Sequence, residues 1–174
     1  MGNNHEKWYD QSKRKILIMA FEDKYINSIA KAISKKEITV NNSIGFSDDE
    51  IYYNNLSLKL YYLTTINRHL WKHHLQGTQG IIMIFSFSSK VEDGTIYEAM
   101  NIFLDSNIKN IPICVCVDYK NKDYTIIEKL RKEINNAKEN LNENIIFQEI
   151  DFDNNINQIK CGFDWLCETM KPLK

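Results

Sequence analysis

The stretch KILIMAFEDKYINSIAKAI, residues 15–33, joins a short apolar run to a segment with helical periodicity. The run at residues 16–19 is typical of a buried strand. Apolar residues then recur at the i, i+3, i+4, i+7 spacing of a one-sided helix, at Ile26, Ile29, Ala30 and Ile33. A strand that leads into a helix is where many α/β proteins bind a phosphate. The first question is therefore whether residues 20–27 can hold one.

The composition is that of an ordinary globular domain. The chain has 174 residues, 43% of them hydrophobic and 26% charged, which allows one domain with a sizeable core. The formal net charge of −1 gives no general reason to expect nucleic acid or an anionic membrane as a partner. No apolar run approaches the roughly 20 residues of a membrane-spanning helix, and the N-terminus lacks the apolar core of a secretory signal. We therefore expect a cytoplasmic protein.

The four cysteines show no metal-binding pattern. Cys114 and Cys116 alternate along an apolar run, and Cys161 and Cys167 lie in a C-terminal helical pattern. None of these spacings matches a zinc site. We expect all four to be buried, reduced thiols.

The rest of the chain alternates between apolar runs and amphipathic segments. Asn54 and Asn55 tolerate positive φ and predict a β-hairpin within residues 48–63. Further strands are predicted at residues 80–88, 111–118 and 144–152, and further helices at residues 67–76, 91–105, 124–141 and 154–170. This order predicts an α/β fold: a mostly parallel six-stranded sheet with one antiparallel edge strand and helices on both faces. Residues 15–174 are expected to form one domain after an N-terminal extension, residues 1–14.

Helical spacing also predicts which side chains face the core. In the helix of residues 91–105 these are Ile96, Met100, Phe103 and Leu104. In the last two helices they are Ile127, Leu130, Ile134, Ile159, Phe163, Leu166 and Met170. Trp71, in the short helix after the hairpin, is also expected in the core.

Three short motifs narrow the fold further. They are IGF at residues 44–46, LWKHHLQGTQGII at residues 70–82 and GFDWLCETMK at residues 162–171. In this strand order they resemble the Arf family of small GTPases, across nearly the whole chain. The resemblance implies the Ras-like small-GTPase fold and, in an intact member, binding of guanine nucleotide with Mg²⁺.

In that family the loop after the first strand binds phosphate. Such a loop needs glycines whose N–H groups turn inward, a Lys for the β- and γ-phosphates, and a Ser or Thr for Mg²⁺. The aligned residues 20–27 contain no glycine, and Tyr25, Ile26 and Asn27 stand at the positions of the second Gly, the Lys and the Thr. Cβ atoms oppose the positive φ values that the loop uses, and the tyrosine ring would fill the space of the phosphate.

The charges in this segment also disfavour a triphosphate. Glu22 and Asp23 precede the helix, where acidic groups suit the positive end of its dipole and repel an anionic ligand. Lys24 is expected to be a solvated lysine of the first helical turn. The segment therefore predicts a helix start without a phosphate.

The remaining nucleotide motifs depart from the family as well. The Asp-x-x-Gly that contacts Mg²⁺ and the γ-phosphate aligns with residues 62–65 (Tyr-Leu-Thr-Thr), and the water-positioning Gln aligns with Ile66. The guanine-reading Asn-Lys-x-Asp aligns with residues 118–121 (Asp-Tyr-Lys-Asn), and the last base loop aligns near residues 152–154. Only Ser43, at the first-switch Thr, keeps its hydroxyl. We therefore expect no catalytic residue, no cofactor and no metal ion, and so no enzyme.

The spacing of one histidine pair is compatible with a metal site. His69 and His73 have an i, i+4 spacing, and His74 lies beside them. No H-E-x-x-H frame and no third ligand accompany them, so we interpret these histidines as structural.

The resemblance implies a protein-binding surface instead. Arf proteins bind effectors partly through an aromatic patch between the switches, and its positions correspond here to Phe46, Tyr61 and His74, with Ile44 beside them. Exposed aromatic clusters mark protein interfaces more often than small-molecule sites. The alternative is that Phe46 and Tyr61 only pack locally.

Two functions follow as expectations. The first is a catalytically inactive Arf-like pseudo-GTPase, a structural or adaptor subunit whose partners are other protein subunits and not nucleic acid; ciliary, mitochondrial and vesicle-coat assemblies are all compatible. The alternative is a divergent GTP-binding protein of membrane or vesicle traffic. Gly2 suggests myristoylation and membrane association, as in Arf, although Glu6 stands where the acceptor pattern has Ser or Thr.

Overall fold

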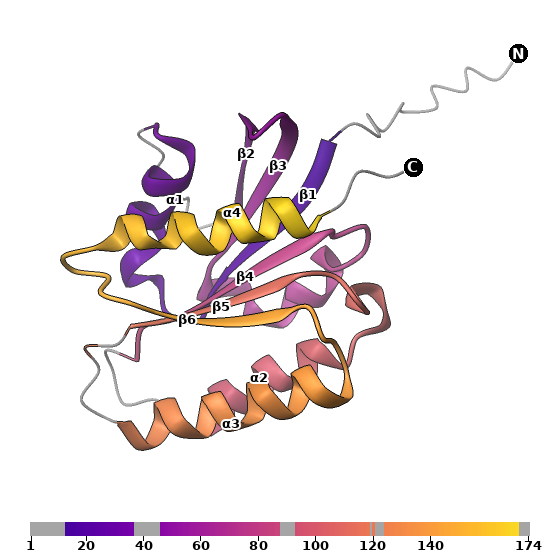
Figure 1. Cartoon of the computed structure of the whole chain (residues 1–174), viewed down its shortest axis with the longest axis vertical. Helices are drawn as coiled ribbons and strands as arrows, with labels where there is room; N and C mark the ends of the chain where they lie inside the picture. The colour runs from indigo at the N-terminus through magenta and orange to yellow at the C-terminus, as the bar shows by residue number, and fades with distance from the viewer. Residues whose placement is uncertain (1–12, 37–45, 88–92, 119, 121–123, 171–174) are drawn as a thin grey trace, which may run out of the picture.

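The structure is a computed structural model that describes residues 13–36, 46–87, 93–118, 120 and 124–170 (Figure 1). Gly2, Ser43 and Ile44 lie outside the described residues. The backbone of Phe46 is described, but its side chain is not.

Six strands form one sheet in the order β2-β3-β1-β4-β5-β6. The strands are β1 (Lys13–Ala20), β2 (Phe46–Tyr53), β3 (Leu56–Leu63), β4 (Gly80–Phe85), β5 (Ile113–Asp118) and β6 (Ile145–Ile150). All neighbouring strands are parallel except β2 and β3, which pair antiparallel at the edge. The predicted fold class, with its one antiparallel edge strand, is confirmed.

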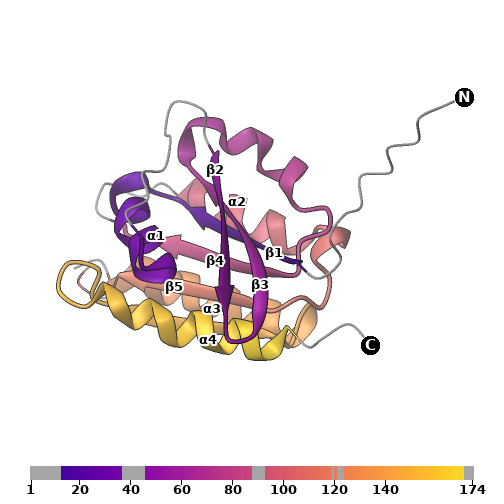
Figure 2. The same cartoon turned by 90° about the horizontal axis from the view of Figure 1, so that it is seen from above.

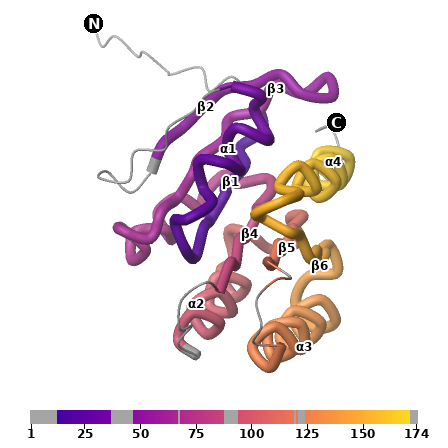
Figure 3. Tube along the Cα trace, turned by 90° about the vertical axis from the view of Figure 1, so that its left-hand side faces the viewer, coloured from indigo at the N-terminus to yellow at the C-terminus, as the bar shows by residue number. Residues whose placement is uncertain are grey.

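Helices cover both faces of the sheet, with α1 and α4 on one side and α2 and α3 on the other (Figures 1 and 3). The α-helices are α1 (Ile26–Ser34), α2 (Asp93–Phe103), α3 (Tyr124–Asn140) and α4 (Ile159–Thr169). Four segments are 3-10 helices: η1 (Asp23–Tyr25), η2 (Thr65–His74), η3 (Ser106–Ile108) and η4 (Ile156–Gln158). The short helix predicted after the hairpin is thus η2, a 3-10 helix that begins at Thr65.

The two faces of the sheet form two hydrophobic clusters. The first packs α1 and α4 against alternate residues of the strands, such as Ile16, Ile18 and Leu60. The second packs η2, α2 and α3 against the residues between them, such as Leu17 and Met19. Because both faces are covered, the central strands β4 and β5 are buried at every position, as their continuous apolar runs indicated.

Most predicted core positions are confirmed. Ile96, Phe103, Trp71 and the predicted residues of α3 and α4 are all buried. Leu104 is a wrong prediction, because it lies just after the end of α2 and is 65% exposed. Cys161 is also exposed, whereas the other three cysteines are buried and all four are free thiols.

The β2–β3 hairpin turns at Asn54 and Asn55, whose φ angles of 47° and 62° confirm the predicted turn chemistry. Its tip lies against α4 (Figure 2), where the Tyr53 hydroxyl donates a hydrogen bond to the carboxylate of Asp164. This contact holds the edge hairpin against the body of the domain.

Candidate functional site

The carboxyl ends of the parallel strands meet at one edge of the sheet. In α/β sheets this is the edge where ligands bind. Five segments lie there: residues 21–25 after β1, 64–65 after β3, 86–87 after β4, Asp118 and Lys120 at the end of β5, and 151–154 after β6. The structure thus brings the predicted phosphate segment together with those predicted nucleotide positions that it describes.

The backbone of residues 20–27 takes the conformations of a strand that leads into a helix. Glu22 is extended, with φ −140° and ψ 141°, and Ile26 is helical, with φ −60°. No residue of this segment has a positive φ. A nest of inward-facing N–H groups alternates right- and left-handed conformations, so this segment does not form one.

Asp23 accepts two hydrogen bonds from Thr65, the first residue of η2. Its Oδ1 accepts a hydrogen bond from the Thr65 backbone N–H at 2.9 Å, and its Oδ2 accepts one from the Thr65 hydroxyl at 2.7 Å. Asp23 lies in the first turn of η1, which leads directly into α1, as expected for an acidic residue before the helix. The N-cap of α1 is Tyr25, whose side chain makes no capping hydrogen bond.

Two further contacts tie the same segment to its neighbours. The Ser86 hydroxyl donates to the Glu22 carboxylate at 2.6 Å. The Arg68 guanidinium donates to the backbone oxygen of Phe21 at 2.8 Å and forms an ion pair with Glu98 at 3.0 Å. Residues 21–23 are thus hydrogen-bonded to Ser86, just after β4, and to Thr65 and Arg68 of η2, and Arg68 in turn is paired with α2.

Aromatic rings fill the space below these contacts. Phe21 stacks on Phe85 with centroids 4.4 Å apart and meets Trp71 edge-on at 5.2 Å. Phe87 stacks on Phe85 from the other side at 5.6 Å. The Trp71 indole N–H donates to the Thr64 backbone oxygen at 3.0 Å. Sequence reasoning missed this cluster, although the aromatic pattern at Phe85 and Phe87 was a visible signal.

Tyr25 occupies the other side of the segment. Its ring packs edge-on against Phe152 at 5.1 Å, and its hydroxyl donates to the Asp153 carboxylate at 2.8 Å. Burial, together with the hydrogen bond to Asp153, raises the pKa of Tyr25 above its usual value. Lys24 lies over the face of the same ring, with its Nζ 4.8 Å from the centroid. Tyr25 thus connects the start of α1 with the segment after β6.

The ends of β5 and β6 carry three acidic residues. Asp118 is 5% exposed and accepts a hydrogen bond from the Lys120 N–H at 3.1 Å. Burial raises the pKa of Asp118, and the charges of Asp153 and Asp151 raise it further. Asp151 forms an ion pair with Lys120 at 3.2 Å and accepts hydrogen bonds from Asn154. Burial alone would raise the pKa of Asp151, but these contacts outweigh it, so the pKa lies below its usual value.

Tyr61 of β3 and His74 of η2, two of the predicted partner-binding residues, lie close together. Their ring centroids are 6.2 Å apart. Lys15 and Lys59, which are register partners in β1 and β3, each place Nζ 5.3 Å from the Tyr61 ring centroid. We call these four half-buried residues the Tyr61–His74 surface. The structure leaves the predicted Phe46 and Ile44 side chains undescribed.

Two basic groups of this surface, His74 and Lys15, have lowered pKa values, with burial as the larger cause. Partial burial, followed by the positive charges of Lys15 and His73, lowers the pKa of His74. Partial burial, followed by the charge of Lys59, lowers the pKa of Lys15, whose Nζ donates to the backbone oxygens of His74 and Gln76. Sequence reasoning missed both lysines, because only the strand register places them near Tyr61.

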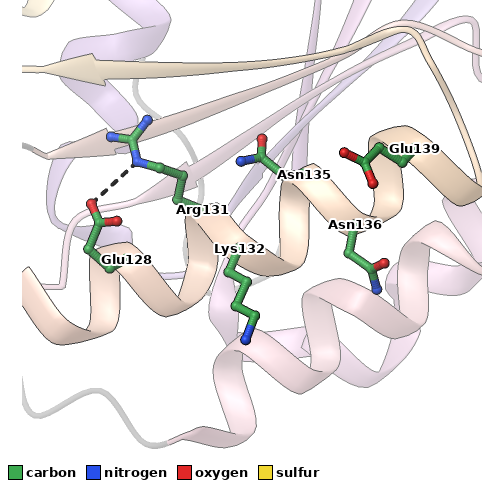
Figure 4. Close-up of a pocket in the computed structure, with 6 residues that line it drawn as sticks. All are labelled: Glu128, Arg131, Lys132, Asn135, Asn136 and Glu139. Carbon is green, nitrogen blue, oxygen red and sulfur yellow. Dashed lines mark ion pairs between the residues drawn. The ribbon is translucent and has the colours of Figure 1, made fainter.

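Other candidate sites carry less chemistry. Within the described ranges, no group of three or more His, Cys, Asp or Glu residues is arranged to hold a metal ion, and His69 and His73 are exposed. A polar hollow of about 350 Å³ lies on α3 (Figure 4), lined by Glu128, Arg131, Lys132, Asn135, Asn136 and Glu139. All its lining residues come from one helix, and it has no apolar floor.

The sheet order and the convergence of these segments at the carboxyl edge define the class of fold, that of the Ras-like small GTPases in their Arf-like form. Among solved structures, the chain is similar to the Arl6 BBS3 small GTPase from Trypanosoma brucei, whose structure holds the nucleotide analogue GppNp. The two are 12% identical, the match covers 91% of this chain and 97% of that one, and the TM-score is 0.67. At this identity the likeness shows the fold. No protein-family model and no curated protein matches the sequence.

Proposed function

We propose that this chain is a catalytically inactive Arf-like pseudo-GTPase that acts as a structural or adaptor subunit of a larger protein assembly through protein–protein contacts. The supporting observation is the bond pair between Asp23 and Thr65. In the Arf alignment Thr65 stands at the glycine whose N–H contacts the γ-phosphate. Here that N–H is bonded to a carboxylate of the chain itself.

The electrostatics of the segment support the same proposal. A phosphate that reached the Thr65 N–H would displace Asp23, and hydrogen bonds to charged groups contribute about 1.5–3 kcal/mol each. The displaced carboxylate would stay close to the anion. Two like charges about 4 Å apart repel by about 4 kcal/mol at an effective dielectric near 20. Glu22, bonded to Ser86, adds a second negative charge nearby.

On the guanine side, the described polar residues are already paired within the chain. Asp118 and Asp151 accept hydrogen bonds or an ion pair from Lys120, and Asp153 accepts one from Tyr25. A base that entered this region would have to break several of these contacts at once. Phosphate and base recognition therefore weaken together.

We expect η2 to keep a single conformation, because a carboxylate of the chain stands where a γ-phosphate would bind. In GTPases of this fold class the switch segments are ordered by the γ-phosphate and released on hydrolysis. Asp23 is part of the chain itself, so its contact with Thr65 does not depend on a bound ligand. This suits constitutive docking of a partner, with the Tyr61–His74 surface as the proposed contact.

Isothermal titration calorimetry with GTP and with GDP, each in Mg²⁺, tests the proposal. We expect no saturable heat from the full chain. The T. brucei Arl6 protein serves as the positive control, because its structure holds a nucleotide analogue. Binding in the micromolar range or tighter would overturn the proposal and favour a divergent GTP-binding protein.

The cell compartment and lipidation remain proposals. We propose a cytoplasmic location, with Gly2 as a candidate myristoylation site. In the described ranges, no helix is both long enough and apolar enough to cross a membrane. Intact-mass measurement of the protein purified from its source cell shows whether Gly2 carries an acyl chain.

A further inference from the structure

A cavity lies between η2 and α2, lined by residues outside the Tyr61–His74 surface. Its volume is about 230 Å³. The floor is apolar and consists of Phe21, Trp71 and Ile102, which are 3%, 3% and 6% exposed. The rim is polar and includes Arg68 and Lys72 from η2 and Glu98 from α2. The floor therefore favours an apolar group and the rim a polar or charged one.

The volume indicates what fits. An apolar cavity of about 150 Å³ binds a benzene molecule, whereas sites for drug-sized ligands and cofactors measure about 300–1,000 Å³. The cavity thus has room for one aromatic or branched aliphatic side chain. It is small for a cofactor.

The rim carries net positive charge. Arg68 and Glu98 neutralise each other in their ion pair at 3.0 Å, and Arg68 also donates to the Phe21 backbone oxygen. The Arg68 Nε is buried without a hydrogen-bond partner among the described residues. Lys72 is exposed and forms no ion pair with any described residue. A carboxylate beside Lys72 would complement this rim.

Exposed apolar side chains also lie on the two helices that form the cavity. On η2 these are Ile66, 55% exposed, and Leu70, 40% exposed. On α2, Tyr97 is 69% exposed and lies one helical turn before Asn101, which lines the cavity. Neighbouring exposed apolar groups around a hollow are typical of protein-binding surfaces.

We propose that this η2–α2 groove docks an acidic, apolar segment of a partner protein, with one aromatic or leucine side chain in the cavity and a carboxylate beside Lys72. The proposal goes beyond the adaptor function. It requires neither the loss of nucleotide binding nor the Tyr61–His74 surface, because none of its lining residues belongs to that surface.

The test is an NMR titration of the ¹⁵N-labelled full chain. The probes are the blocked peptides acetyl-Glu-Leu-Phe-Glu-amide and acetyl-Lys-Leu-Phe-Lys-amide, with indole as a neutral probe. We expect saturable shifts at the Trp71 indole N–H and the Ile102 amide with the acidic peptide. The basic peptide and indole should each bind at least about tenfold more weakly, a difference of about 1.4 kcal/mol.

Matched variants separate the groove from the rest of the molecule. K72E should weaken the acidic peptide about tenfold, whereas K132E, the same charge change on α3, should leave its affinity unchanged. Y61A should also leave the affinity for the acidic peptide unchanged. Loss of binding at the η2–α2 groove can therefore be told apart from loss of the adaptor contact at the Tyr61–His74 surface. A retained Trp71 indole signal shows that each variant is folded.

Several results would overturn the proposal. These are equal affinity for the two peptides, an equal effect of K72E and K132E, shifts centred on Tyr61 and His74, and a titration that does not saturate. Indole binding as tight as that of the acidic peptide would also overturn it and identify a small-molecule cavity instead.

Discussion

Asp23 and Thr65 lie on different segments of the chain, yet both carboxylate oxygens of Asp23 accept hydrogen bonds from Thr65, at 2.9 Å from its N–H and 2.7 Å from its hydroxyl. This bidentate contact connects the turn after β1 with the start of η2. It joins two segments that in a nucleotide-binding member of this fold class would be bridged by the ligand.

Replacement of Asp23 tests the strength of that contact. D23A should lower the free energy of unfolding by about 2–3 kcal/mol, because the Thr65 N–H and hydroxyl each lose a charged acceptor. The measurement is urea denaturation followed by tryptophan fluorescence. Glu139, an exposed acidic residue of α3, provides the control E139A, which should change stability by less than about 0.5 kcal/mol. Equal effects of the two variants would contradict the prediction.

The hairpin contact provides a second prediction. Y53F removes the hydroxyl that donates to the Asp164 carboxylate and should cost about 1.5–3 kcal/mol. Y52F is the matched control, since Tyr52 is 75% exposed and its hydroxyl lies 3.5 Å from the Asn55 side chain. We expect Y52F to unfold at nearly the wild-type temperature. A Y53F protein as stable as Y52F would show that the hairpin does not depend on α4.

His74 predicts a dependence of stability on pH. Its pKa is lowered in the folded state, by burial first and then by the charges of Lys15 and His73, so the unfolded chain binds a proton more readily. The free energy of unfolding should therefore fall as the pH drops through about 6.5, the unfolded pKa, towards the lower folded pKa. H74Q should remove part of that loss, and H73Q should retain it. Identical pH profiles for wild type and H74Q would refute this assignment.

Partner capture tests the Tyr61–His74 surface. Y61A removes the ring that contacts both Lys15 and Lys59 and should reduce co-purification of partner subunits from the source cell at least about tenfold, as expected for a central aromatic contact. Y124A, at a 71% exposed tyrosine of α3, is the control. The measurement is quantitative mass spectrometry of the captured proteins. Equal capture by both variants would place the partner contact elsewhere.

An aromatic deletion tests the filled edge of the sheet. F21A removes a ring that contacts both Phe85 and Trp71 and should lower the free energy of unfolding by about 3–5 kcal/mol. L141A, at a 42% exposed leucine, should cost much less. Thermal unfolding followed by circular dichroism compares them. A loss below about 1 kcal/mol for F21A would mean that the stack contributes little to the fold.

Local sequence patterns determined the elements and their order. The apolar runs predicted the buried strands, the i, i+3, i+4, i+7 spacing predicted α1 and α3, and Asn54-Asn55 predicted the turn. These features depend on neighbours within a few residues, so periodicity reveals them. The same reasoning was wrong for Leu104, because spacing alone does not show where α2 ends and its covered face stops.

The contacts between elements were decided by the tertiary structure. The sequence predicted that Glu22 and Asp23 precede a helix and disfavour an anion, but not that they bond Ser86 and Thr65. Nor did it show that Lys15 and Lys59 both lie near the Tyr61 ring, or that a cavity opens between η2 and α2. The physical reason is sequence separation: hydrogen-bond partners and cavity walls come from strands and helices that only sheet pairing and core packing bring together.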